Sequence, residues 1–337
     1  MKSNQVTRSQ RAGFTLPELL VSMTILLVLM TLLAAMLGQV QKTWTNSEGR
    51  ISQFREARVA FDIISKNLAQ ASLNTYWDYD YDADGQVTEY RRQSELHFVS
   101  FNKPEFANSD GEVLGHSVFF QAPLGYSSQF RNLSNLYNAR GYYVMHGSDR
   151  PFRPSFVESA EKYRFRLMEY FPPSEENMIY NDGDQDRLAE RDPEYQEWWK
   201  YKIEEYSHPL AENIIALVVS PRESLDSQTG GGSAVSSIAE DYIYDSSDVG
   251  QNTAQQVPPL VRVTLIAIDE TSAVQLETQY GDGVPPLETT SLFTNTGSYQ
   301  GDIETLKASL DDKRLSYKVF NTAIGIRSSK WSNNEFN

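Results

Sequence analysis

The sequence contains no cysteine among its 337 residues. Disulfide bonds, thiolate metal ligands and thiol nucleophiles are therefore excluded. The folded part of the chain must be held together by packing, with or without bound ions.

Basic residues are also few relative to acidic ones. The 30 Lys and Arg face 45 Asp and Glu, which gives a formal net charge of −15. Proteins that bind nucleic acid neutralise phosphates with clustered Lys and Arg. The charge balance therefore predicts no nucleic-acid partner.

Catalytic signatures are missing as well. There is no G-x-S-x-G turn, no P-loop and no G-x-G-x-x-G after a predicted strand. The four histidines lack the H-E-x-x-H spacing of metal hydrolases and are interpreted as structural: His97, His116, His146 and His208. The sequence thus predicts a protein that is not an enzyme; an enzyme would need ionisable groups that converge in a cleft of the folded part.

What the sequence does have is one long apolar run. Phe14–Leu37 contains a single ionisable residue, Glu18. A helix of this length spans about 36 Å, enough to cross a bilayer. The residues ahead of it that carry charge are all basic, which predicts a single-pass inner-membrane protein with a cytoplasmic N-terminus and a periplasmic or extracellular head. The run is longer than the apolar part of a secretory signal, so a permanent anchor is predicted.

Glu18 is the unusual residue of this run. A carboxylate within an apolar helix costs about 2.5–3.5 kcal/mol even on lenient insertion scales. The residue alone leaves two interpretations open: the side chain reaches the membrane interface, or it meets a partner of opposite charge.

The residues around Glu18 carry a resemblance. Arg11–Leu20, with the sequence RAGFTLPELL, resembles the class III signal of type IV pilins and type II secretion pseudopilins. The resemblance implies cleavage after Gly13, N-methylation of Phe14, and pairing of Glu18 with the Phe14 amine of a neighbouring subunit. The implied partners are a prepilin peptidase/methyltransferase and other pilin-like subunits, bound through the N-terminal helix. Losing the leader's three basic residues would change the net charge to 27 − 45 = −18.

The helical period continues beyond the membrane segment. Apolar residues recur every three or four positions from Phe54 to Ala71, which predicts one helix from near Phe14 to near Leu73, with Gly38 and Gly49 as weak points. The predicted domains are a leader (1–13), a transmembrane and assembly helix (14–37), its amphipathic continuation (38–74) and a head (75–337).

The head is predicted to be α+β, with the long helix packed on an antiparallel sheet. The predicted strands are Glu95–Phe101, Ser117–Gln121, Tyr142–Met145, Tyr163–Phe171, Ile214–Ser220, Leu260–Ile268 and Ser316–Arg327. Alternation in the fourth strand predicts a sheet with one face largely packed. Helices are predicted at Pro193–Glu205 and Ile303–Leu310, and a flexible insertion at 223–259.

Two finer resemblances concern the head. The last three predicted strands are similar in order to the C-terminal half of J-type minor pseudopilins. NTYWDYDYDADG together with RQSELHFV is similar to the Verru_Chthon cassette protein C family. The predicted function is a minor structural subunit of a type IV pilus-like or type II secretion-like filament or tip complex. The alternative is a membrane-anchored acidic protein that binds an exported protein or surface ligand. Exposed aromatic residues near Trp198 would support this alternative.

One candidate cofactor is calcium. Asp80, Asp82, Asp84 and Gln86 follow the first part of a calcium-loop pattern, with Gly85 at the turn. The twelfth position is Arg91 where the pattern needs an acid, so a solvated acidic turn is the other interpretation. A second acidic turn, 181–186, has no full ligand pattern. The aromatic pairs Trp198–Trp199 and Tyr76–Trp77 are predicted to lie either on a binding surface or in the core.

Overall fold

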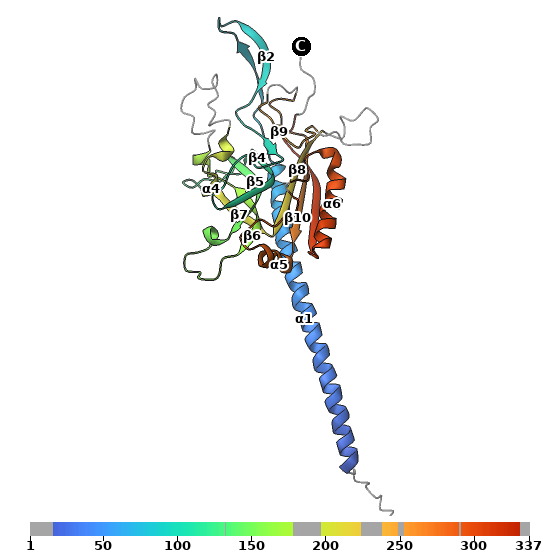
Figure 1. Cartoon of the computed structure of the whole chain (residues 1–337). Helices are drawn as coiled ribbons and strands as arrows, with labels where there is room; N and C mark the ends of the chain where they lie inside the picture. The colour runs from blue at the N-terminus through green and yellow to red at the C-terminus, as the bar shows by residue number, and fades with distance from the viewer. Residues whose placement is uncertain are drawn as a thin grey trace, which may run out of the picture. The chain divides into compact units, whose positions relative to one another are not determined.

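The computed structural model describes residues 16–131, 133–177, 197–223, 238–248, 253–289 and 291–330, without the side chains of residues 40–53, Asp80 and Glu89. Contacts divide the chain into two compact units, residues 1–51 and 52–337. The predicted α+β architecture is confirmed: a long N-terminal helix is followed by antiparallel sheets (Figure 1). The predicted domain boundaries stay predictions.

Helix α1 spans Leu16–Leu68 without interruption, Gly38 included. In the second unit its residues Ala57, Phe61, Ile64 and Leu68 are buried, at the spacing that the sequence predicts. The helix ends five residues before the predicted Leu73. After the helix, the amides of Gln70 and Ala71 donate to carbonyls three residues earlier, and the Ser72 amide donates to Gln121 O. The helix thus ends in a tight turn, and the chain then contacts the strand residue Gln121.

The described strands of the second unit form three sheets. A six-stranded antiparallel sheet has the order β7-β6-β5-β4-β3-β9, a three-stranded sheet the order β11-β10-β8, and β1 pairs with β2 alone. The strands are β1 (Tyr76–Tyr81), β2 (Val87–Gln93), β3 (Val99–Phe101), β4 (Gly111–Pro123), β5 (Tyr137–Ser148), β6 (Tyr163–Tyr170), β7 (Ser207–Glu212), β8 (Ile214–Arg222), β9 (Tyr244–Asp245), β10 (Leu260–Ile268) and β11 (Tyr317–Gly325). The sequence did not predict β1, β2, β7 or β9.

Three further α-helices lie among the described residues: α4 (Ile203–Tyr206), α5 (Glu270–Tyr280) and α6 (Tyr299–Asp312). Helix α6 contains the predicted Ile303–Leu310. The described part of the predicted helix Pro193–Glu205 is helical only in pieces: a 3-10 turn at Trp198–Lys200 is followed by α4, which begins at Ile203. Residues 193–196 lie outside the described residues.

The six-stranded sheet is covered on both faces, so the prediction of one packed face is wrong. One core joins α1 and the three-stranded sheet to residues such as Phe165 and Leu167 of β6. A second core, around Met168 and Tyr170 of the same strand, includes Trp198 and Trp199. The alternating Arg residues of β6 misled the prediction because they are buried within ion pairs.

The described part of the predicted insertion belongs to the fold. Strand β9 pairs with β3, and Tyr242 and Tyr244 are buried. The Tyr244 hydroxyl donates to Gln256 O at 2.8 Å. Residues 224–237 and 249–252 of the insertion lie outside the described residues.

Candidate functional site

The first candidate site is the start of α1. The helix begins at Leu16, with Pro17 and Glu18 in its first turn. Proline is favoured there because the first helical amides have no partner within the helix, and a carboxylate is favoured because the helix N-terminus carries partial positive charge. Gly13 and Phe14 lie outside the described residues, so their predicted roles stay predictions.

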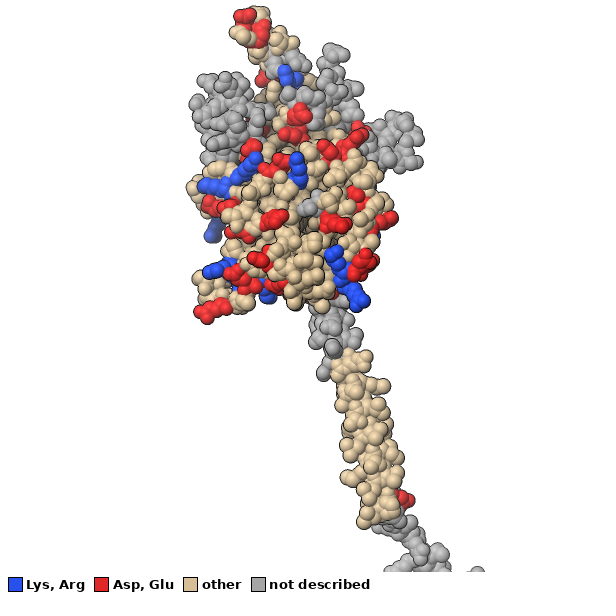
Figure 2. All heavy atoms as spheres, in the orientation of Figure 1, with Lys and Arg blue, Asp and Glu red and all other residues tan. Residues whose placement is uncertain are grey.

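The segment that follows is apolar on every side. Leu16–Gln39 has a mean hydropathy of 2.6, and none of it is buried. It is the one helix among the described residues that is long and apolar enough to cross a membrane. Figure 2 shows the contrast with the second unit, whose surface carries many acidic and basic side chains.

Hydroxyl groups in this segment are satisfied within the helix. The side chains of Ser22, Thr24 and Thr31 each donate to a carbonyl three residues earlier, at 2.8–2.9 Å. Such bonds remove most of the cost of placing a hydroxyl in hydrocarbon, where water offers no replacement. The three polar residues are therefore compatible with a lipid environment.

The predicted calcium loop forms the turn of the β1–β2 hairpin. Asp82 Oδ1 accepts the amides of Asp84 and Gln86 at 3.0 and 2.8 Å, and Gly85 has a φ of +75°. Asp80 lies in β1, where the register places it opposite Glu89, and the side chains of both are undescribed. No group of three His, Asp or Glu among the described residues has the arrangement of a metal site. Calcium binding stays a prediction, and the turn at 181–186 lies outside the described residues.

The tryptophan pair is part of the core. Trp198 and Trp199 are 3% and 6% exposed and contact Phe119 with ring centroids 6.3 and 6.4 Å apart. Among the described residues, the tryptophan pair therefore does not supply the exposed aromatic cluster that would have favoured a binding function. Tyr76 and Trp77, by contrast, are both 37% exposed.

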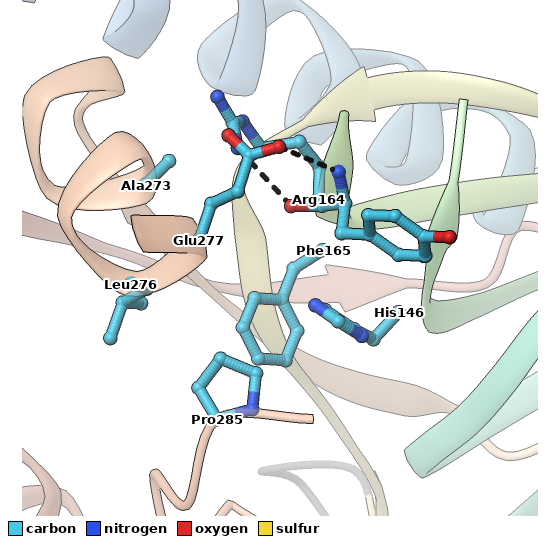
Figure 3. Close-up of a pocket in the computed structure, with 8 residues that line it drawn as sticks. His146, Arg164, Phe165, Ala273, Leu276, Glu277 and Pro285 are labelled. Atoms are coloured by element: carbon cyan, nitrogen blue, oxygen red, sulfur yellow. Dashed lines mark hydrogen bonds and ion pairs between the residues drawn. The ribbon is translucent and has the colours of Figure 1, made fainter. Parts of the chain in front are cut away.

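A pocket beneath α5 brings ionisable groups together (Figure 3). Glu277 of α5 accepts the Tyr163 amide at 3.0 Å and pairs with Arg164 of β6, which also contacts Glu270 at 3.3 Å. Burial and the neighbouring Arg166 and Arg164 lower the pKa of His146 to about 4, so the ring is neutral at pH 7. The cavity volume is about 10 Å³, which is about the room that one water molecule needs. The pocket joins α5 to the sheet and has no space for a substrate.

The other described histidines have structural surroundings. His116 Nε2 lies 2.9 Å from Phe293 O, and its Nδ1 accepts the Val219 amide at 3.3 Å. Burial lowers the pKa of His116 to about 4 despite these bonds. His97 lies between Asp245 and Trp198, and His208 is exposed.

Comparison with known proteins indicates the class of protein. Residues 8–34 match the family model of the prokaryotic N-terminal methylation motif. No curated protein and no solved structure matches the chain. The chain therefore carries a prepilin-type N-terminus that runs into an apolar helix and an α+β head, as in pilin-like proteins. This motif supports a type IV pilin-like or pseudopilin subunit, and the family is structural rather than catalytic.

Proposed function

We propose that the chain is a minor pilin-like or pseudopilin subunit that is processed by a prepilin peptidase and assembled into a filament or tip complex. The observation that supports this is the methylation motif at residues 8–34, which continues into the exposed apolar helix Leu16–Gln39. Before assembly this helix holds the subunit in the inner membrane, with the N-terminus in the cytoplasm and the head in the periplasm or outside the cell.

Processing after Gly13 changes the charges at the membrane edge. It removes Lys2, Arg8 and Arg11 and creates an amine at Phe14. Glu18 is then the fifth residue of the mature chain. Methylation leaves the amine positively charged. An ion pair between this amine and Glu18 of the next subunit would neutralise both charges in an apolar environment and define the axial register of the two helices.

The head favours a minor subunit over a repeated shaft subunit. It is large and carries features outside its two main sheets, such as the separate β1–β2 hairpin. A shaft of many copies has to repeat every protruding element along the filament, whereas a tip or priming complex contains it once. The role proposed for the chain is therefore structural.

N-terminal sequencing and intact mass of protein from membranes test the proposal, with and without a co-expressed prepilin peptidase. The expected mature chain begins at methylated Phe14 and appears only with the peptidase. Gly13→Leu serves as the matched control, because a branched side chain replaces the small residue of the cleavage site. A chain that begins at Met1 in every sample, or that is cut after Leu37, would contradict the proposal.

A further inference from the structure

The β1–β2 hairpin has an exposed aromatic face. Tyr79, Tyr81 and Tyr90 are 51%, 62% and 50% exposed, and Trp77 lies beside them. The pairs Trp77–Arg92 and Tyr79–Tyr90 are opposite one another in the register, so these side chains share one face of the ribbon. Exposed apolar clusters of this kind mark interaction sites in soluble domains.

The face is organised in advance. The Trp77 and Tyr90 rings stack with centroids 5.2 Å apart, and Tyr79 contacts Tyr90 at 4.9 Å. Within the described part of the chain the two strands pair only with each other, and Figure 1 shows the hairpin standing away from the larger sheets. A ribbon of two strands is marginally stable by itself, so contacts among these rings support its shape.

The base of the hairpin is fixed to the head. Asn74 Oδ1 accepts the amides of Glu95 and Leu96 and the Ser94 hydroxyl, at 2.9–3.2 Å. The Thr75 hydroxyl donates to Gln255 O at 2.6 Å. These bonds join both ends of the ribbon to one another and to the segment that follows β9. A partner would meet an arm that is held in place at its base.

The charge of the arm indicates the chemistry of the partner. Between Tyr76 and Gln93 the chain has five acidic residues and two basic ones, Arg91 and Arg92, which lie toward the base of β2. The tip is therefore acidic, and acidic side chains gather there (Figure 2). Aromatic faces attract cations, and the guanidinium of Arg92 already lies 5.7 Å from the Trp77 ring centroid. A second copy of this chain, with its net negative charge, would be repelled.

We propose that this aromatic face, defined by Trp77, Tyr79, Tyr81 and Tyr90, docks a partner protein through its arginine and lysine side chains. Cations of the partner lie over the rings and near the carboxylates of the tip. Because the site is exposed, its carboxylate contribution weakens with salt, whereas the ring contacts persist to higher ionic strength.

Binding of a nine-residue arginine peptide to the full-length chain in detergent tests this inference. Tyr79→Ser combined with Tyr90→Ser removes two rings without changing the charge, and we expect the Kd to rise about tenfold. Glu304→Gln combined with Asp312→Asn, on α6, removes two exposed acids elsewhere and should change the Kd less than about twofold. Amide hydrogen exchange of residues 76–93 reports whether the hairpin stays folded. If it opens, Tyr81→Ser is used, since the contacts of Tyr90 with Trp77 and Tyr79 then remain.

Three results would overturn the inference. Loss of affinity in the α6 variant without loss in the tyrosine variant would mean that the peptide senses only the overall negative charge. Binding of cellohexaose that depends on the same tyrosines, without binding of the arginine peptide, would mean that the face takes a polysaccharide. Concentration-dependent self-association that the tyrosine variant abolishes would assign the face to a second copy of the chain.

Discussion

At the scale of single residues, His97 joins three segments that are far apart in the sequence. Its Nδ1 lies 3.1 Å from Trp198 Nε1, which can only donate, so this nitrogen accepts. The ring proton is then on Nε2, which donates to Asp245 at 2.6 Å. Burial raises the pKa of Asp245, but the bonds from His97 and Ser247 outweigh it and lower the pKa to about 2. The carboxylate form is therefore favoured in the fold.

Asp245→Asn should lower the free energy of unfolding by about 1 kcal/mol at pH 7, since a partly exposed charge-assisted bond is lost. The folded pKa of Asp245 is below its ordinary value of 3.8. The stabilisation is thus complete above pH 4 and disappears as the pH falls toward 2. Urea unfolding of the parent and variant at several pH values measures this difference. Asp62→Asn, at an exposed position of α1, is the control, and a difference independent of pH would contradict the assignment.

The buried Arg164 supplies a second residue-scale prediction. Its side chain is nearly inaccessible and its partners are Glu277 and Glu270. Glu277→Ala should lower the free energy of unfolding by about 3 kcal/mol, because the buried Arg164 guanidinium then keeps only its contact with Glu270. Replacing both partners, by Arg164→Met with Glu277→Leu, should recover much of that loss. Urea unfolding curves of the two variants measure this recovery. A double variant that is less stable than Glu277→Ala would show that the ion pair itself is strongly stabilising.

At the scale of elements, α1 is stabilised in the second unit by one buried stripe. Ile64→Ala should lower the free energy of unfolding by about 2–5 kcal/mol, because the side chain is fully buried between the helix and the sheets. Val59→Ala, on the exposed side of the same helix, should cost less than about 0.5 kcal/mol. Tryptophan fluorescence during urea unfolding in detergent measures both changes. Similar losses in the two variants would mean that helix propensity, and not packing, determines the stability.

The sequence predicted those elements whose signal is local and repeated. The helical stripe and the continuous apolar strands β8 and β10 were recognised because periodicity and length identify them directly. Helix α5 was missed, although Asp269 accepts the Ser272 amide at 2.8 Å as an N-cap, because only Ser272, Ala273 and Leu276 are buried and the apolar signal is weak.

The β1–β2 hairpin shows why the rest could not be read from sequence. Alternating aspartates fit a calcium loop, and the same alternation with tyrosine and tryptophan fits a strand. The pairing with β2 shows that residues 76–81 form a strand, while calcium binding at the turn stays a prediction. The burial of Trp198 and Trp199 likewise depends on a distant strand residue, Phe119. The N-terminal motif, in contrast, is linear and needs no fold to be recognised.

At the scale of the whole molecule, two surfaces of different chemistry are suited to two kinds of proposed partner. The exposed face of Leu16–Gln39 is apolar and suits lipid before assembly and other helices afterwards. The head is acidic, and its exposed aromatic face suits a cationic partner. The proposed subunit therefore joins a filament through one unit and leaves the other unit available for recognition.

Glu18→Gln separates processing from assembly. The amide cannot form an ion pair with the Phe14 amine of a neighbour, so co-isolation with other pilin-like subunits should fall at least about tenfold. Cleavage and membrane insertion should persist, because the leader and apolar run are unchanged. Intact mass reports cleavage, and cross-linking in membranes followed by co-purification reports assembly. Ser22→Ala, in the next turn, is the matched control. If the Glu18→Gln variant co-isolates with other subunits as well as the wild type does, apolar packing alone holds the helices in register and Glu18 has another role.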